Sequence, residues 1–312
     1  MEATVIICTY NRCHNLVDCF AALEKQREVD DLRWEVLLVD NNSTDGTRGF
    51  TEAYARQSPL RLRYVFAPEQ GLSRARNHGI GQAGGRYLIF IDDDIRVTPE
   101  WLAAMVRTFR EHDCDAVGGR IHLEIPLDRL PRWIRPDMYG FLGYQDFGVK
   151  PYRLDGWKEF PFGGNMAIQR QVFDRIGGFD PDMGRKGAGR RKNELFKGEE
   201  TDFFHRLADQ GGVIWYQPNA LVEHKVLPHQ LERRFFLSLH HNAGLLKAQR
   251  DSGAYPRTIL GVPRFLYLQW TRALWKYLAL TMRFGTAHSF RQLMNVAYFT
   301  GMVQAYHQKS KQ

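Results

Sequence analysis

Short apolar runs alternate with amphipathic stretches through the first two-thirds of the chain. Runs of β-branched and aromatic residues, which are typical of buried strands, cover residues 3–9, 34–39, 62–66, 87–91 and 116–123. Between the first two runs, apolar residues recur at helical spacing, as Leu16, Phe20 and Leu23 do. Strands that alternate with helices in this way predict a doubly wound α/β sheet with a crevice of nucleotide size.

Residues 124–160 interrupt this pattern with four prolines and many aromatic residues. Such a composition predicts irregular surface structure that covers one side of a site. Regular structure is then predicted at 162–168, in a helix over 171–176, in a helix that begins at Gly198 and in a strand over 211–216. We therefore expect one α/β domain over residues 1–228 and a helical extension over residues 229–312.

Three carboxylates, Asp92, Asp93 and Asp94, follow the apolar run at 87–91 directly. Ligands of open α/β sheets bind at the carboxyl ends of the strands, and like charges this close repel unless a cation holds them. If the strand continued, Asp92 and Asp94 would share a face that could reach Mg²⁺ or Mn²⁺, and Asp93 would point away. The alternative is a solvated acidic turn that caps the next helix.

Charge and cysteine content narrow the class of protein. The net charge of +8 and the isoelectric point of about 9.3 favour anionic partners, which on charge alone are nucleotide phosphates, lipid head groups or nucleic acid. The four cysteines form no C-x-x-C pair, so they support neither a disulfide framework nor a zinc site. No signal peptide and no uninterrupted apolar span is visible, and a reducing cytoplasm fits best.

One glycine pattern, Gly79-x-Gly81-x-x-Gly84, matches the dinucleotide-binding fingerprint in letters alone. That fingerprint follows a strand and opens a helix, whereas this stretch is predicted to close a helix and lead into a strand. The pattern therefore does not predict dinucleotide binding.

Two further stretches carry candidate chemistry. Residues 183–197 combine glycines with basic residues, which predicts either a mobile loop that closes over a phosphate or a basic loop without a role; the basic residues include Arg185, Lys186, Arg190, Arg191 and Lys192. Glu199, Glu200 and Asp202 begin the helix after Gly198, where acidic groups also stabilise the positive end of the helix dipole.

Five stretches in this order resemble the inverting glycosyltransferases of family 2, which have the GT-A fold. They are residues 5–12 (VIICTYNR), 39–47 (VDNNSTDGT), 71–79 (GLSRARNHG), 90–94 (FIDDD) and 198–202 (GEETD). The resemblance covers about residues 3–226. It implies a mixed sheet with a Rossmann-like nucleotide-binding half, followed here by the C-terminal helical extension.

The resemblance also implies roles for individual residues. Positions that hold the donor in relatives match Thr9, Tyr10, Asn11, Arg12, Asp40, Asn41, Arg76, Asp92, Asp93, Gly163, Gly164 and Asn165. Asp94 matches the direct metal ligand of the family's D-x-D motif, with Asp92 beside it and His224 completing the Mn²⁺ or Mg²⁺ site. Glu200 matches the catalytic base.

The implied reaction is transfer of a sugar from a nucleoside diphosphate sugar, with a UDP-sugar favoured, to a hydroxyl of a glycan or lipid-linked acceptor, in cell-surface polysaccharide or glycolipid synthesis. A general base suits this chemistry because the acceptor hydroxyl must lose its proton as it attacks. Nucleic acid is not an expected partner. The alternatives are a sugar-nucleotide pyrophosphorylase, which would need a glycine-rich basic loop absent from residues 8–12, and a noncatalytic membrane-binding or glycan-binding module.

The helical extension leaves two alternatives open. Its aromatic residues lie among basic ones, as Trp270, Trp275 and Tyr277 lie near Arg272 and Lys276. Helices of this composition either pack on a folded domain or rest on an anionic membrane surface. We expect peripheral attachment to the inner face of the cell membrane.

Overall fold

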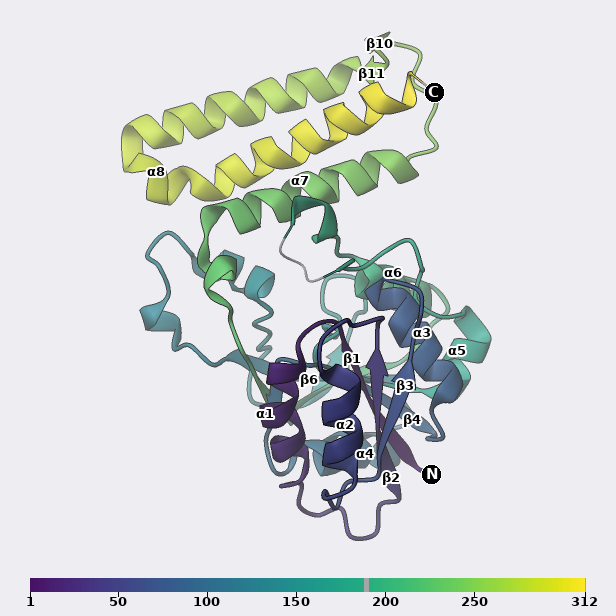
Figure 1. Cartoon of the computed structure of the whole chain (residues 1–312). Coiled ribbons are helices and arrows are strands. Elements are labelled where there is room, and N and C mark those ends of the chain that lie inside the picture. Colours follow the sequence, from purple (N-terminus) through teal and green to yellow (C-terminus); the bar gives the residue numbers. More distant parts are fainter. Residues whose placement is uncertain (188–190, 312) are drawn as a thin grey trace. The chain divides into compact units, whose positions relative to one another are not determined.

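The computed structural model describes residues 1–187 and 191–311, which form two compact units (Figure 1). The first unit consists of residues 1–125, 143–187 and 198–225. The second consists of residues 126–142, 191–197 and 226–311. Two segments that precede residue 228 in the sequence thus belong to the unit that contains the C-terminal helices.

A mixed β-sheet organises the first unit, as predicted. Its strands are β1 (Ala3–Thr9), β2 (Trp34–Asp40), β3 (Leu62–Phe66), β4 (Tyr87–Asp92), β5 (Ile95–Val97), β6 (Ala116–Leu123), β7 (Tyr152–Leu154), β8 (Met166–Gln169) and β9 (Ile214–His224). They lie in the order β3-β2-β1-β4-β8-β6-β9-β5, and β7 pairs with β9. The strands β3, β2, β1 and β4 are parallel to one another, and β8 lies antiparallel between β4 and β6. The sheet is therefore doubly wound at one end and mixed at the other.

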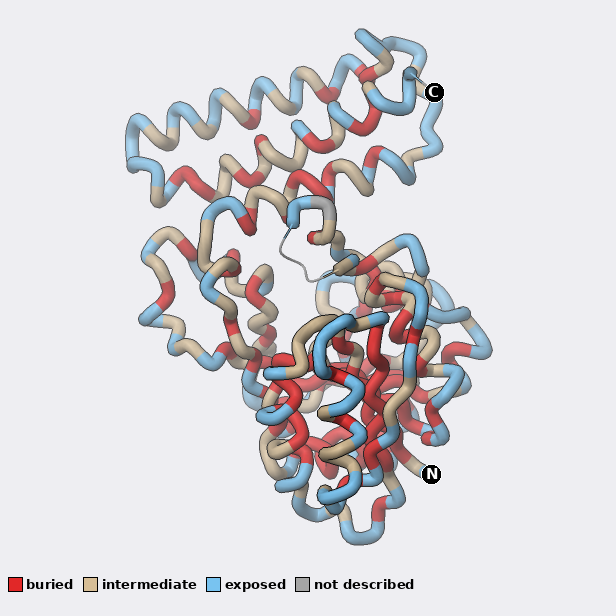
Figure 2. The backbone as a smooth tube through the Cα atoms, in the orientation of Figure 1, coloured by how far each residue is buried: buried red, intermediate tan, exposed pale blue. Residues whose placement is uncertain are grey.

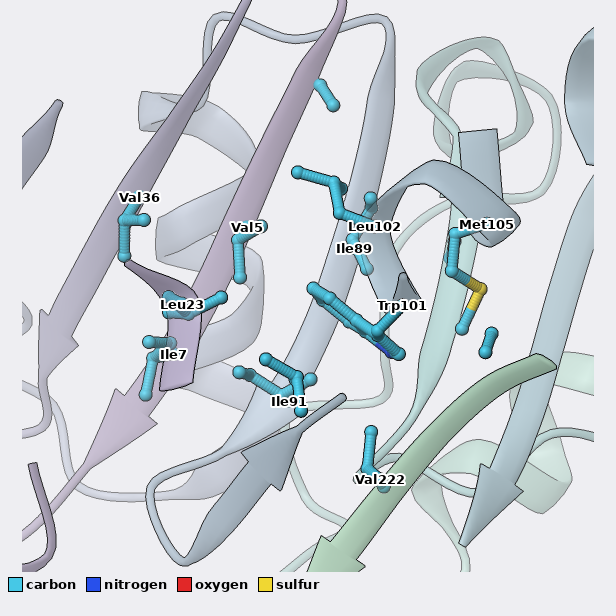
Figure 3. Packing of buried hydrophobic residues seen from close by; sticks show 14 of the residues in the cluster. Val5, Ile7, Leu23, Val36, Ile89, Ile91, Trp101, Leu102, Met105 and Val222 are labelled. Carbon is cyan, nitrogen blue, oxygen red and sulfur yellow. The ribbon is translucent and has the colours of Figure 1, made fainter. Parts of the chain in front are cut away.

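Helices cover both faces of this sheet. They are α1 (Cys13–Leu23), α2 (Thr47–Ala55), α3 (Leu72–Gln82), α4 (Trp101–Glu111), α5 (Arg170–Ile176) and α6 (Glu199–Asp209). One core packs α1 and α4 on the sheet, and Figure 3 shows Trp101 of α4 lying against Ile89 and Ile91 of β4. The other core packs α3, α5 and α6 on the opposite face. The central strands are buried on both sides, which explains why their sequences are continuously apolar (Figure 2).

Some details of the first unit differ from the expectations. The strand expected at 211–216 is β9, which begins at Ile214 and continues to His224, with a register shift opposite Gly119 and Arg120 of β6. The strands β5 and β7 were not predicted. The glycine pattern at Gly79 lies at the end of α3 and leads into β4, so its rejection as a dinucleotide fingerprint is confirmed.

The second unit is mainly helical. It contains α7 (Arg233–Arg250), α8 (Arg264–Lys309), a small hairpin of β10 (Thr258–Ile259) and β11 (Val262–Pro263), and the short 3-10 helices η1 (Leu127–Arg129), η2 (Pro136–Leu142), η3 (Lys192–Glu194) and η4 (Pro228–Leu231). Gly285 has a φ of 79° and divides α8 into two helices, 264–284 and 286–309. Because only glycine adopts this conformation readily, Gly285 lets the chain fold back on itself.

Two glycines allow α7 to approach the second half of α8 closely. A Cβ on Gly244 would overlap the carbonyl oxygen of Tyr298, and a Cβ on Gly301 would overlap the carbonyl oxygen of His241. The two backbones therefore touch at this crossing. In Figure 1, residues 286–309 lie between α7 on one side and residues 264–284 on the other.

No helix within residues 1–187 and 191–311 is both long enough and apolar enough to cross a membrane.

Candidate active site

The topology places several sequence-predicted residues at one edge of the sheet. The strand order reverses at β1, which has β2 on one side and β4 on the other. Thr9, Asp40 and Asp92 are the last residues of these three parallel strands. In doubly wound sheets this edge is where ligands bind, so the fold itself brings these three residues together.

Asp93 and Asp94 lie in a turn between β4 and β5, so the alternation of an extended strand does not apply to them. The expectation that Asp93 points away from Asp92 and Asp94 assumed that the strand continues, and this condition is not met. Asp93 is buried, accepts a hydrogen bond from Thr9 Oγ1 at 2.6 Å, and lies 3.3 Å from the guanidinium of Arg12. Burial raises the pKa of Asp93 to about 6, although the charge of Arg12 opposes the rise.

Asp94 pairs with two groups that come from distant parts of the chain. Its Oδ2 lies 3.1 Å from Arg12 Nη1, and its Oδ1 lies 3.4 Å from His224 Nε2 at the end of β9. Burial alone would raise the pKa of Asp94, but the charges of His224 and Arg12 outweigh burial and hold this pKa below its usual range. The structure thus brings together Asp94 and His224, two of the three residues that were predicted to form the metal site.

The donor set around Asp94 fits a hard divalent cation in part. Asp94 Oδ1 and His224 Nδ1 are buried and make no hydrogen bond among the described residues, although Oδ1 lies 3.4 Å from His224 Nε2. A carboxylate oxygen and an imidazole that could ligate a cation therefore lie next to each other. Asp92 does not join them, because it faces Arg76 instead. Accordingly, no group of three or more His, Cys, Asp or Glu residues suited to a metal is found among the described residues.

Arg76 is the main cation of the neighbouring cluster. It projects from α3, is 2% exposed, and pairs with Glu199 Oε1 at 3.1 Å and with Asp92 Oδ1 at 3.6 Å. Its guanidinium also lies over the ring of Phe179, 5.5 Å from the ring centre. A buried guanidinium held in this way can attract the phosphates of a nucleotide without moving.

Glu200, the predicted base, lies beside Arg76 at the start of α6. A Cβ added to Gly163 would lie 2.6 Å from Glu200 Oε1 and would overlap the guanidinium of Arg76. A Cβ added to Gly164 would lie 3.4 Å from Asp92 Oδ2. The two glycines therefore let the backbone approach all three charged side chains, which a larger residue would push apart.

Glu199 is a member of this cluster that the sequence did not single out from its neighbours. Its side chain is buried, and burial together with the charge of Glu200 raises its pKa to about 8. Its position in the first turn of α6 suggested helix capping, which is an equally good reason for an acidic residue there. Only the tertiary contact with Arg76 distinguishes it.

The end of β2 holds a rigid polar loop. Asp40 accepts hydrogen bonds from the Ser43 backbone N–H and from Tyr64 Oη, both at 2.8 Å. Asn41 donates to the Glu69 carbonyl at 2.6 Å and accepts from the Gly71 N–H at 2.9 Å. These bonds fix the loop that follows β2 against the start of α3.

The loop after β1 meets the same region. Asn11 adopts a positive φ of 52°, donates its backbone N–H to Ser43 Oγ at 2.9 Å and accepts the Thr44 N–H at 2.7 Å. Tyr10 beside it is half-buried. The two loops predicted to hold a nucleoside are therefore joined to each other.

Asn165 differs from the other predicted donor-binding residues because its side chain is fully used within the fold. It accepts the indole N–H of Trp101 at 2.8 Å and donates to the carbonyls of Arg120 and Ala220 at 2.9 and 2.8 Å. Asn165 thus holds the register shift between β6 and β9 in place. A contribution to donor binding would have to come from the backbone of this segment.

The beginning of the basic loop at 183–197 lies against α3. Ser73 donates to the Met183 carbonyl at 2.9 Å, and the Leu72 N–H donates to the Arg185 carbonyl at 2.9 Å. Gly189 and Arg190 of the expected mobile loop lie outside the described residues. Arg185 stands close enough for its charge to lower the pKa of Asp94.

A family model described as glycosyl transferase family 2 matches residues 4–177. The succinoglycan biosynthesis protein ExoM of Rhizobium meliloti is 27% identical over 256 residues, which are 79% of this chain and 75% of that protein. The glucosyl-dolichyl phosphate glucuronosyltransferase of Haloferax volcanii is 26% identical over 239 residues, 74% of this chain and 72% of that protein.

Among solved structures, the mannosyltransferase PcManGT of Pyrobaculum calidifontis, in complex with GDP-Man and Mn²⁺, is similar to this fold. The TM-score is 0.64 at 19% identity, covering 100% of this chain and 88% of that one. TarS 1-349 of S. aureus, in complex with UDP, has a TM-score of 0.56 at 17% identity, covering 99% and 92%. These structural matches confirm the expected GT-A fold. The family model and the sequence relatives support a glycosyltransferase rather than a pyrophosphorylase or a noncatalytic module.

Proposed function

The chain belongs to glycosyl transferase family 2, and we propose that it transfers a sugar from a nucleoside diphosphate sugar to an acceptor hydroxyl with inversion at the anomeric carbon. Glu200 is the general base in this proposal. The acceptor is a glycan or a lipid-linked saccharide in the synthesis of a polysaccharide or glycolipid.

The observation that carries the proposal is the convergence of Glu200, Arg76 and Asp92 on the backbone of Gly163 and Gly164. A cation and a carboxylate base next to one stretch of glycine backbone suit a sugar that carries a leaving diphosphate on one side and meets a hydroxyl on the other. The glycines let the side chains of Arg76 and Glu200 approach this backbone closely. Such a centre supplies both the charge for the leaving group and the proton acceptor for the nucleophile.

In the proposed step the acceptor oxygen attacks the anomeric carbon and gives its proton to the Glu200 carboxylate. The bond from that carbon to the diphosphate oxygen breaks, and its electron pair leaves with the nucleoside diphosphate. Arg76 stabilises the negative charge that grows on the diphosphate. Because attack and departure occur on opposite sides of the carbon, one displacement inverts the configuration.

Asp94 and His224, with Asp92 nearby, are the residues that would hold a divalent cation such as Mn²⁺ or Mg²⁺. The buried Asp94 Oδ1, which lies 3.4 Å from His224 Nε2, supports this assignment, and so does the Mn²⁺ in the complex of PcManGT. When bound, the cation would supply charge stabilisation to the leaving diphosphate. Arg12 fixes the orientation of Asp94 from the opposite side.

The remaining donor-binding roles follow from the loops at the ends of β1 and β2. Asp40 and the backbone around Asn11 and Asn41 suit a nucleoside, because they combine a buried carboxylate with a loop fixed by hydrogen bonds. The solved relatives bind GDP-Man in one case and UDP in the other. We propose a UDP-sugar as the donor of this protein. The names of the two sequence relatives, which refer to succinoglycan and to a dolichyl phosphate, support a glycan or lipid-linked acceptor.

A donor panel tests this function. The purified chain is incubated with UDP-sugars and GDP-sugars, with and without Mn²⁺, and the released nucleoside diphosphate is measured. We expect release from one donor, stimulated by Mn²⁺, that is lost in Glu200→Gln. Release from no donor in the presence of mixed cell-envelope acceptors would contradict the proposal.

A further inference from the structure

The outer surface of residues 264–284 carries an apolar stripe that no described residue covers. Its members are Leu268, Trp275, Leu278 and Met282, whose side chains are 58%, 70%, 41% and 81% exposed. At 3.6 residues per turn these four positions fall within an arc of roughly 80°. We call this set the outer stripe. The four residues share one face of the helix, whereas apolar residues scattered singly over a surface would need no explanation.

The outer stripe is not the face by which this helix packs. The opposite face holds the buried Leu266 and Ala273 and contacts residues 286–309. There Trp270 Nε1 donates to Thr300 Oγ1 at 3.0 Å, and Thr281 Oγ1 donates to Ser289 Oγ at 2.7 Å. The helices of this unit therefore pack against each other without using the residues of the outer stripe.

Cations border the outer stripe along one side. Arg272, Lys276 and Arg283 are exposed and, by the same helical geometry, fall within an arc of roughly 40° next to it. The charged Lys and Arg residues of the surrounding sequence, residues 252–312, are not balanced by any acidic residue. The last 61 residues contain eight Lys and Arg and no Asp or Glu, which equals the whole net charge of +8, so residues 1–251 are formally neutral.

The hairpin of β10 and β11, which precedes α8, also exposes apolar residues among cations. Ile259 and Leu260 at its tip are 48% and 72% exposed. Tyr267 Oη donates to the Ile259 carbonyl at 3.3 Å, which holds the tip beside the first turns of the helix. Arg257 and Arg264 flank the tip and are exposed. Aliphatic residues at a tip with cations around it repeat the arrangement of the outer stripe.

We propose that the outer stripe and the hairpin tip bind the surface of an anionic lipid bilayer. The apolar side chains enter the boundary between head groups and acyl chains, and Trp275 anchors at that level because its indole is amphipathic. The long stems of Arg272, Lys276 and Arg283 let their charges reach the lipid phosphates.

A second copy of this chain is a poorer occupant. Stripe-to-stripe pairing would bring the two rows of Arg272, Lys276 and Arg283 near each other with no acidic residue in this segment to compensate. An anionic bilayer neutralises the same charges. The charge pattern therefore selects lipid over self-association.

Flotation with lipid vesicles tests the proposal on the full chain. We expect binding to vesicles of phosphatidylcholine and phosphatidylglycerol in equal amounts, little binding to phosphatidylcholine alone, and loss of binding as salt is raised. The double variant Arg272→Glu/Lys276→Glu should bind the anionic vesicles roughly thirtyfold more weakly or worse, since each basic residue contributes about a fivefold share near such a surface. Trp275→Ser/Met282→Ser should also bind more weakly.

Matched controls use exposed residues of the other unit. Lys150→Glu/Lys158→Glu makes the same change in net charge, and Val149→Ser removes an exposed apolar side chain; both should bind as the wild type does. All variants should keep the thermal unfolding temperature of the wild type, because the altered residues are exposed. Quenching of tryptophan fluorescence by brominated lipid should fall in Trp275→Phe, which still binds.

Three results would overturn the proposal. The wild type could fail to bind anionic vesicles at low salt. The stripe variants could bind as well as the controls do. The wild type could instead form a dimer in solution that Trp275→Ser dissolves, without vesicle binding, in which case the outer stripe joins two copies of the chain. None of these results depends on sugar transfer, so failure here leaves the proposed reaction untouched.

Discussion

The two units of this glycosyltransferase differ in which side chains they bury and which they leave exposed. The unit that carries the sheet buries Arg76, Asp93, Asp94 and Glu199 almost completely at one strand edge. The helical unit instead leaves the outer stripe of α8 in solvent and adds only cations around it. Burying a charge costs free energy unless partners compensate, and exposing a large apolar side chain forfeits the gain of burying it.

We infer that each departure from the usual arrangement marks a binding surface. In the first unit the partner expected is anionic and small enough to meet buried cations. In the second unit it is extended and apolar with a negative surface.

The largest effect is expected from Asp94→Asn, which removes a buried charge. A neutral amide cannot replace the carboxylate toward a hard cation, so transfer should be abolished and Mn²⁺ binding, measured by electron paramagnetic resonance with the nucleoside diphosphate present, should be lost. The exposed Asp113→Asn is the control and should behave as the wild type. Normal turnover of Asp94→Asn at limiting Mn²⁺ would remove Asp94 from the metal site.

Glu200→Gln should separate binding from chemistry. Gln keeps the shape of the side chain but cannot accept the proton, so turnover should fall roughly 10²–10⁴-fold while donor affinity, measured by calorimetry, stays the same. Glu111→Gln, an exposed change of the same type, controls for lost charge. A collapse of donor affinity with normal residual turnover would assign Glu200 to the donor pocket instead.

Packing in the helical unit should be sensitive at its glycine crossing. Gly301→Ala puts a Cβ into the His241 carbonyl, so α7 and α8 must separate, and we expect a loss of about 1–3 kcal/mol in the free energy of unfolding. Gly81→Ala in α3 is the matched control, because a Cβ there meets nothing within 4 Å and should be neutral or stabilising. Equal unfolding temperatures for the two variants would contradict the close approach.

The smallest effects concern pH, and they should have opposite signs in the two units. Glu199 holds its proton more tightly when folded, so its contribution to stability is full below its ordinary pKa of 4.5 and is lost as the pH rises through about 8. Burial lowers the pKa of His240 from 6.5 to about 4, so stability is full above 6.5 and is lost as the pH falls toward 4.

Thermal unfolding of two variants across this pH range measures both slopes. Relative to the wild type, Glu199→Gln should gain stability as the pH rises, and His240→Gln should gain stability as the pH falls. Parallel curves for wild type and variant would show that the group does not titrate differently on folding.

The strands that were predicted correctly are mostly buried, and each of them is a run of mainly apolar residues in the sequence. The predicted strands at 3–9, 62–66 and 116–123 coincide with β1, β3 and β6. The strand expected at 211–216 stopped short of the end of β9 at His224, and the register shift opposite β6 falls within the part that was not predicted. Periodicity contains no information about such a shift.

At the candidate site the sequence identified residues but not their partners. Asp92 and Asp94 were expected to act as a pair, yet Arg76 from α3 holds one and Arg12 with His224 holds the other. These contacts join residues far apart in the chain, so no local spacing reveals them. The burial of Glu199 beside Arg76 was missed for the same reason.

The anomeric configuration of the first product, observed by proton nuclear magnetic resonance as the reaction proceeds, tests the proposed chemistry most directly. A single displacement with Glu200 as base predicts a product whose configuration at the transferred carbon is opposite to that of the donor, from the first turnover onward. A product that retains the donor's configuration would require a second displacement, and it would contradict the account of how Glu200, Arg76 and the glycine backbone act together.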